Sequence, residues 1–233
     1  MSITPASTQA VRRSRLVPSL LGIPAIVMVL ITWQVVSHGP LLNFDALVSR
    51  ALMHPDRFSE LLSALGDVQI AVPVFAFAAG YTAWRGWICG LSRWWAPPSV
   101  AATQMAVLPA IVVPLKDWTA RPGTAAVPPG VGYFPSGHTA TAAIAYGCLA
   151  LLLLPWLRSP TARRATVGMC AALVLAVSYG LVRRGWHWPL DVVASWCICT
   201  VLLTILALTI SRSMTRRSGD GASITSDARG YSV

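Results

Sequence analysis

The stretch Tyr133-Phe134-Pro135-Ser136-Gly137-His138-Thr139 stands where a loop rich in proline and glycine gives way to the apolar run Ala140–Leu157. Ser136 is a good N-cap, because its hydroxyl can accept from a backbone N–H of the first helical turn. Gly137 lets a ligand approach the backbone closely, and His138 falls on that first turn. A helix N-terminus attracts anions, so an imidazole placed there suggests proton transfer to or from a bound oxyanion. A capped helix start with an incidental histidine is the simpler interpretation of the same residues.

The apolar run after this stretch is one of several. The 233 residues are 55% hydrophobic and 11% charged, which is too apolar for an ordinary soluble domain. About 20 apolar residues cross the hydrocarbon core of a bilayer. The stretches of about this length are Leu16–Val36, Val68–Trp84, Val100–Leu115, Ala140–Leu157, Ala165–Val182 and Val192–Ile210. We therefore predict an all-α polytopic membrane protein, with six transmembrane helices in a bundle over residues 16–210.

The charge distribution predicts the orientation of this bundle. With a cytoplasmic N-terminus, twelve of the 18 Lys and Arg residues fall on the cytoplasmic side, as the positive-inside rule requires. The net charge of +10 then reflects topology and attraction to anionic lipid rather than nucleic-acid binding. The polar ends, residues 1–15 and 211–233, are predicted to be a disordered cytoplasmic leader and tail. The preference for arginine over lysine hints at a bacterial source, and so at the bacterial cytoplasmic membrane.

Two further features bear on the site. The cysteines show neither disulfide nor zinc spacing, so we predict buried thiols, no metal site and no cofactor. The polar segment 37–67 predicts a short interfacial helix, on which His38 and His54 are interfacial rather than catalytic. The five cysteines are Cys89, Cys148, Cys170, Cys197 and Cys199.

Three polar clusters, residues 116–122, 135–138 and 183–191, all fall on the extracytoplasmic side of the predicted bundle. Ionisable groups at span ends are costly unless solvated or paired, so their gathering predicts a functional site. His187 and Asp191 are four residues apart, so the carboxylate can hold one ring nitrogen and leave the other as a nucleophile. His138 could protonate a leaving oxygen, and Lys116 and Arg121 could neutralise phosphate. Singly, the cations are also explained as interfacial anchors and Asp191 as a helix-start charge.

These clusters resemble the three-motif signature of the type 2 phosphatidic acid phosphatase superfamily, which also contains the vanadium haloperoxidases and bacterial undecaprenyl-pyrophosphate phosphatases. The resemblance covers roughly residues 100–210, and residues 135–138 and 187–191 carry it. It implies a metal-independent phosphatase with a phosphohistidine intermediate, in which His187 is the nucleophile, Asp191 its orienter and His138 the general acid. The residues that the resemblance implies for the phosphate cradle are Lys116, Arg121, Ser136, Gly137 and one of Arg183 and Arg184.

The arginines depart from the family pattern. Four residues separate Lys116 from the Arg121-Pro122 pair, where the family usually has six. The arginine of the third motif usually lies six residues before the histidine, at the position of Leu181 here. On a continuous helix Arg183 would share a face with His187, so we prefer it to Arg184. The departures leave the catalytic dyad intact and concern the phosphate cradle.

The leading hypothesis is a lipid phosphatase at the outer face, acting on polyprenyl pyrophosphate, phosphatidic acid or phosphatidylglycerol phosphate. The alternative is a catalytically weak or inactive relative that binds or transports phospholipid head groups, and a third is a purely structural scaffold. A pure binder has no need of an oriented histidine, which counts against the second. The partners expected are a lipid phosphate and membrane lipids, with the oligomeric state left open.

Overall fold

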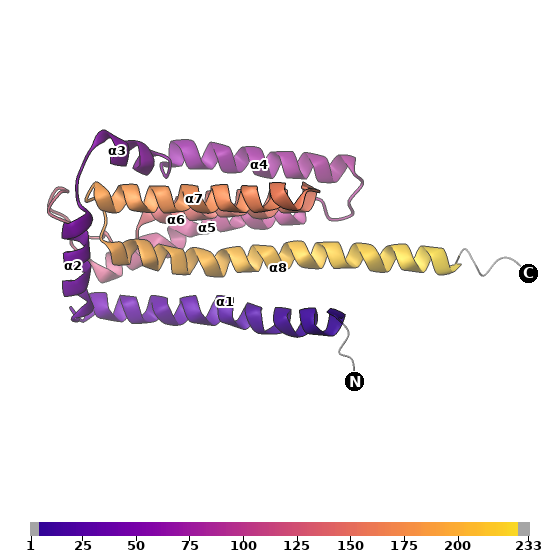
Figure 1. The fold of residues 1–233 in the computed structure, drawn as a ribbon, viewed down its shortest axis with the longest axis horizontal. Coiled ribbons are helices and arrows are strands. Elements are labelled where there is room, and N and C mark those ends of the chain that lie inside the picture. The colour runs from indigo at the N-terminus through magenta and orange to yellow at the C-terminus, as the bar shows by residue number, and fades with distance from the viewer. Residues whose placement is uncertain (1–4, 228–233) are drawn as a thin grey trace, which may run out of the picture.

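The structure is a bundle of long, nearly parallel helices with one short helix lying across one end (Figure 1). It is a computed structural model that describes the backbone of residues 5–227 and the side chains of residues 17–211. The elements are α1 (Pro5–Val36), α2 (Leu41–Leu52), α3 (Arg57–Ala64), α4 (Val68–Ile88), α5 (Ala96–Thr119), α6 (Gly137–Leu153), the 3-10 turn Leu154–Trp156, α7 (Pro160–Arg183) and α8 (Pro189–Asp227).

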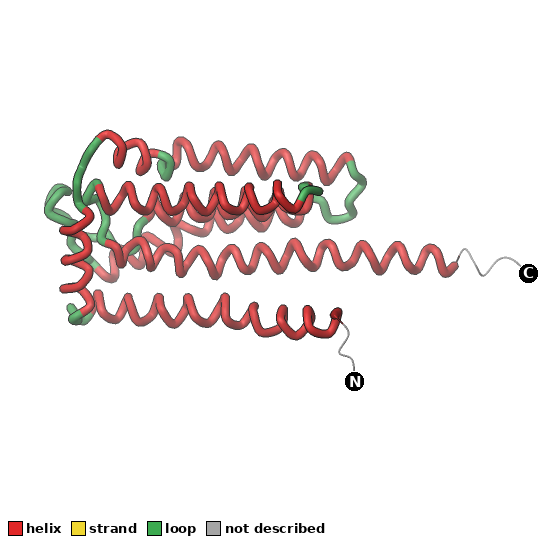
Figure 2. Tube along the Cα trace, in the orientation of Figure 1, coloured by secondary structure: helices red, strands yellow, loops and turns green. Residues whose placement is uncertain are grey.

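The predicted all-α membrane fold is confirmed. Between residues 5 and 227 the chain forms helices joined by loops and no β-strand (Figure 2). Six helical stretches within the described residues are long and apolar enough to cross a membrane, and each overlaps one of the predicted spans. The chain is a multi-pass membrane protein.

Helix α6 lies at the centre of the bundle, where it packs against α4, α5, α7 and α8. Its inward faces are lined by small residues, among them Ala140, Ala142 and Ala145, which are fully buried. Small side chains let neighbouring membrane helices approach closely. At Gly147 a Cβ atom would lie 2.4 Å from Leu203 on α8. Because of this packing, the N-terminus of α6 is surrounded by the neighbouring helices at one end of the bundle.

The first and last helices extend beyond the predicted spans. Helix α1 begins at Pro5, although a disordered leader was predicted over residues 1–15. Helix α8 continues to Asp227, although a disordered tail was predicted from residue 211. No proline follows Pro189 in this stretch, so the helix that starts in the membrane meets no strong stop signal. Residues 1–4 and 228–233 of the two predicted segments lie outside the described residues.

Segment 37–67, for which one interfacial helix was predicted, forms two helices. Helix α2 lies across the end of the bundle (Figure 1). It exposes apolar Phe44 and Leu47 and buries polar Asp45 and Ser49. Helix α3 starts with a capping box, in which the Asp56 side chain accepts from the N–H of Ser59 at 2.7 Å. The face of α2 turned toward the bundle is therefore its polar face.

The prediction of five buried thiols is wrong for Cys89. Four of the cysteines are buried, but Cys89 is exposed. It is the C-cap residue of α4, just beyond the apolar span. A residue at that position lies beyond the packed part of the helix bundle, so its side chain is exposed.

Candidate active site

The loops that precede α6 and α8 meet at the end of the bundle that carries α2 (Figures 1 and 2). The backbone N–H of Ser136 donates to the carbonyl of Asp191 at 3.1 Å. The hydroxyl of Ser195 donates to the carbonyl of Ser136 at 2.8 Å. The starts of α6 and α8 are thus fixed to one another, which brings the sequence clusters 135–138 and 183–191 together.

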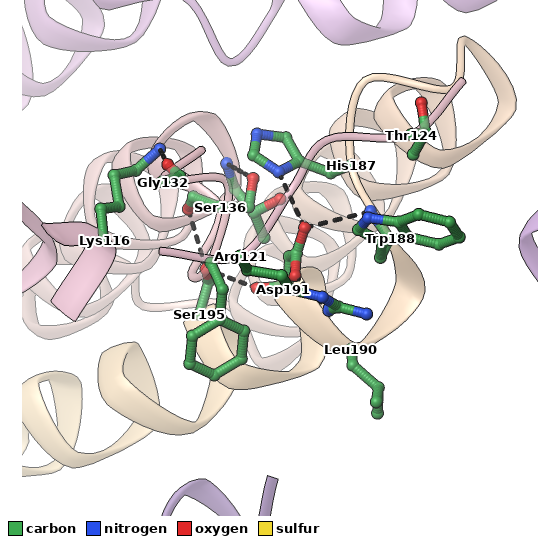
Figure 3. Close-up of polar contacts among 12 residues, drawn as sticks. Lys116, Arg121, Thr124, Gly132, Ser136, His187, Trp188, Leu190, Asp191 and Ser195 are labelled. Atoms are coloured by element: carbon green, nitrogen blue, oxygen red, sulfur yellow. Dashed lines mark hydrogen bonds and ion pairs between the residues drawn. The ribbon is translucent and has the colours of Figure 1, made fainter. Parts of the chain in front are cut away.

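His187 and Asp191 form a buried pair at the start of α8 (Figure 3). Nδ1 of His187 lies 3.2 Å from Oδ2 of Asp191, and the backbone N–H of Trp188 donates to the same oxygen at 3.1 Å. A carboxylate in this position favours the tautomer with its proton on Nδ1. Nε2, which has no hydrogen-bond partner among the described residues, then carries a free lone pair.

The N-terminus of α6 is capped as predicted. Oγ of Ser136 accepts from the N–H of Thr139 at 3.3 Å, and Ser136 is fully buried. Gly137 and His138, by contrast, line the cavity described below. Their N–H groups belong to the first turn, whose donors have no partner within the helix and suit an anion. Ser136 therefore caps the helix, while Gly137 and His138 line the cavity.

His138 contacts a carboxylate that the sequence analysis did not select. Its Nε2 lies 3.3 Å from Oδ1 of Asp67, the N-cap residue of α4. The ring lies 6.5 Å from that of His187 and 5.9 Å from that of Trp186, centroid to centroid. The two histidines therefore stand side by side, each with its own aspartate. The available signal was the position of Asp67 directly before the apolar run from Val68.

Lys116 and Arg121, both predicted to bind phosphate, have different surroundings. Nζ of Lys116 donates to the carbonyl of Gly132 at 3.0 Å, and Lys116 lines the cavity (Figure 3). Arg121 is 6% exposed and lies outside the cavity lining. Its Nη1 and Nη2 donate at 2.5 Å each to Asp191 and Asp45. The structure therefore gives Arg121 two carboxylate partners.

The preference for Arg183 over Arg184 assumed a continuous helix from Arg183 to His187, and the structure does not have one. Helix α7 ends at Arg183, and Gly185 turns the chain with a φ of +75°. Arg183 points to Asp56, which its Nη2 meets at 2.8 Å. Arg184 lies 3.7 Å from the centre of the Trp186 ring and donates to Ser63 at 3.1 Å. Of the two arginines, Arg184 is thus nearer the cavity, through Trp186.

The Arg183–Asp56 ion pair lies outside the cavity lining, and Asp56 is ionised at neutral pH. The hydrogen bond from Arg183 is the main cause that lowers the pKa of Asp56 to about 2. The pKa of Asp45 is raised instead, because burial outweighs the hydrogen bond from Arg121.

A cavity of about 740 Å³ opens between the N-terminal end of α4 and the C-terminal half of α5, beside the α5–α6 loop. Lys116, His138 and His187 are among its polar lining residues. Its other walls are mostly apolar and include Val68 of α4 and Val113 of α5. One cavity thus joins a cationic, imidazole-lined end to an apolar wall on the membrane side. Among the described residues, no three His, Cys, Asp or Glu side chains are grouped as a metal site would require.

The sequence matches the model of one protein family. The family model of the PAP2 superfamily matches residues 98–215, just over half of the 233 residues. The chain belongs to the PAP2 superfamily. The matched region contains every side chain of the three clusters, whereas Asp45 and Asp67 lie before it.

The fold of this PAP2 protein is similar to that of a transmembrane PAP2-type phosphatidylglycerolphosphate phosphatase from Bacillus subtilis, known from a crystal structure. The match has a TM-score of 0.64 and 20% sequence identity, and it covers 84% of this chain and 96% of the other. At that identity the match establishes the shared fold. No curated protein matched the sequence.

Proposed function

We propose that this PAP2 protein hydrolyses a lipid phosphate or lipid pyrophosphate through a phosphohistidine on His187. The observation that carries the proposal is the buried His187–Asp191 pair, in which Nδ1 of His187 is held by Asp191. His187 lines a cavity together with His138 and Lys116. A histidine oriented by a carboxylate is an activated nucleophile.

The first step transfers the phosphoryl group to the protein. Nε2 of His187 attacks phosphorus, an N–P bond forms, and the P–O bond to the leaving group breaks. The leaving oxygen takes a proton from His138, which stands close beside His187. Lys116 and the first-turn N–H groups of α6 neutralise the charge on the phosphate oxygens. Asp191 stabilises the positive charge that His187 gains.

The second step regenerates the protein. His138, now the base, takes a proton from a water molecule whose oxygen attacks phosphorus. The N–P bond breaks, its electron pair returns to Nε2, and inorganic phosphate leaves. Within this scheme His138 acts first as the acid and then as the base, and no metal ion is required.

The apolar walls of the cavity support a lipid as the substrate. Phosphatidic acid, phosphatidylglycerol phosphate and polyprenyl pyrophosphate each place a phosphate next to a hydrocarbon tail. Such a molecule would set its phosphate at the histidines and its tail against α4 and α5, where the cavity is lined by Val68, Val112 and Val113.

The proposal is tested by phosphate release from purified protein in detergent and EDTA, with these three lipids in parallel and His187→Ala as the control. We expect release that persists in EDTA and falls by at least about 10³-fold in the variant. Loss of release in EDTA would refute metal independence. Absence of release from every lipid would refute the phosphatase and favour a protein that binds phospholipid head groups.

We also propose that the site faces outward across a bacterial cytoplasmic membrane, with both termini cytoplasmic. The start of α1 and the end of α8 lie at the opposite end of the bundle from the site (Figure 1). Cys89 ends α4 on that opposite side and is exposed. Val131 lies in the α5–α6 loop at the site end and is exposed. In spheroplasts, a membrane-impermeant maleimide should react with Val131→Cys in a Cys89→Ser background, and with Cys89 only after permeabilisation. Labelling of Cys89 in intact spheroplasts would reverse the assigned topology.

A further inference from the structure

A buried carboxylate outside the three sequence clusters makes two contacts with the site. Asp45 of α2 is 2% exposed. Its Oδ2 accepts from Nη2 of Arg121 at 2.5 Å, and its Oδ1 accepts from the backbone N–H of Leu190 at 2.9 Å. These partners are 76 and 145 residues away along the chain. One side chain thus joins α2 both to the α5–α6 loop and to the first turn of α8.

Arg121 connects this carboxylate with the one that orients His187. Its Nη1 donates to Oδ1 of Asp191, while Oδ2 of Asp191 holds His187 (Figure 3). The guanidinium also lies 5.4 Å from the centre of the Trp188 ring. The buried groups therefore form a continuous row, namely His187, Asp191, Arg121 and Asp45.

The charges along this row explain what Asp45 contributes. If Arg121 were paired with Asp191 alone, its positive charge would weaken the interaction of that carboxylate with His187. With Asp45 present, Arg121 is shared between two carboxylates, so Asp191 keeps more negative charge for the imidazole. The low dielectric of a buried site strengthens this effect.

The backbone contact adds a geometric role. The N–H of Leu190 lies in the first turn of α8, where donors have no partner within the helix. Asp45 supplies an acceptor from another element and so fixes the turn that carries Asp191. The burial of Asp45 on the inner face of α2 is consistent with this role, since that helix exposes Phe44 and Leu47 instead.

We infer that Asp45 is a positioning residue for the reaction proposed above: through Arg121 and the Leu190 N–H, it holds the Asp191 carboxylate that orients His187. This inference rests on the proposed function. It makes α2, which lies outside the region matched to the PAP2 superfamily, part of the catalytic apparatus. It also assigns Arg121 the role of linking the two aspartates, which its Nη1 and Nη2 contact.

The test is Asp45→Asn, which keeps the shape of the side chain and removes its charge. On the lipid that the wild type hydrolyses fastest, we expect kcat to fall roughly 10- to 100-fold, as for a misoriented nucleophile. KM and the inhibition constant for inorganic phosphate should stay within about twofold of the wild type. The matched control is Asp56→Asn, which breaks an exposed aspartate–arginine pair at the same end of the bundle and should leave kcat unchanged.

A second measurement tests the route through Arg121. Arg121→Gln should lower kcat, and the double variant with Asp45→Asn should be no worse than Arg121→Gln alone. Asp45→Glu, which restores the charge one methylene further out, should recover part of the activity and serves if the Asn variant does not fold.

Three results would overturn the inference while leaving the phosphatase intact. They are wild-type kcat in Asp45→Asn, additive losses in the double variant, and loss of phosphate binding and of the folded state in both Asp45 variants. Absence of hydrolysis by the wild type itself would instead refute the proposed function.

Discussion

His138 differs from His187 in its environment, although both pair with an aspartate. His187 is buried, whereas His138 is 38% exposed on its side chain and meets the half-exposed Asp67. A buried, held imidazole suits a nucleophile. An accessible one that reaches both the cavity and solvent suits a group that gives and regains protons with each turnover.

This division of roles predicts a dependence on the leaving group. His138→Gln should lower hydrolysis of a lipid phosphate by about 10²- to 10⁴-fold, the usual contribution of a general acid. It should lower kcat/KM for p-nitrophenyl phosphate much less, because nitrophenolate leaves without protonation and kcat/KM reports the first, phosphoryl-transfer step. The second step, in which His138 is the base, is the same for both substrates. The measurement is the ratio of kcat/KM values for the two substrates. An equal loss on both would remove His138 from the role of acid and assign it to phosphate binding.

At the scale of single residues, the sequence predicted contacts between residues of the same helical turn or the same motif. The four-residue spacing of His187 and Asp191 sufficed to predict their contact. Asp45 and Asp67 could not be found in this way, because their partners lie far along the chain and depend on where α2 and α4 start. The environment of Arg121 was missed for the same reason, since the second carboxylate comes from α2.

Among the elements, α3 and α7 show how the site end is held together. At Gly180 of α7, an added Cβ would lie 2.7 Å from the backbone nitrogen of Ser63 and 3.0 Å from the carbonyl oxygen of Ser59. Backbone atoms cannot move aside as a flexible side chain can. The absence of a side chain at Gly180 is therefore what lets α3 lie against α7, beside Arg184 and its contact with Ser63.

Gly180→Ala should accordingly destabilise the protein by about 1–3 kcal/mol, the usual cost of overpacking. The matched control is Gly168→Ala on the same helix, where an added Cβ meets nothing within 4 Å. That variant should be as stable as the wild type or slightly more so. The check is thermal unfolding in detergent for both variants. A Gly180→Ala protein as stable as Gly168→Ala would show that α3 is free to shift.

The elements themselves were the most predictable part of the molecule. Six apolar runs gave six membrane helices, because a chain in lipid must satisfy its backbone internally and helices do so. What hydropathy does not mark is where a helix stops within a polar stretch. The turn at Gly185 separates Arg183 from His187, and this single break redirected one arginine to Asp56.

For the molecule as a whole, the arrangement of α4 and α5 decides how a lipid could reach the site. Both helices pack on the central α6. The cavity lies between the N-terminal end of α4 and the C-terminal half of α5. Val113 lines it there and is 52% exposed, so this wall faces the surroundings of the bundle. A lipid could therefore enter sideways from the bilayer leaflet at the site end of the bundle, with its tail remaining in the bilayer.

Lateral access predicts that a bulky residue at this wall discriminates by tail length. Val113→Trp should raise KM for a long-chain lipid phosphate by roughly 10-fold, while kcat/KM for p-nitrophenyl phosphate, which has no tail, stays near that of the wild type. The control is Val107→Trp, which places the same indole at an exposed position of α5 outside the cavity lining. Kinetics in mixed micelles with both substrates provide the measurement. Equal effects on the two substrates would contradict lateral access, because the indole would then disturb the phosphate site that both substrates share.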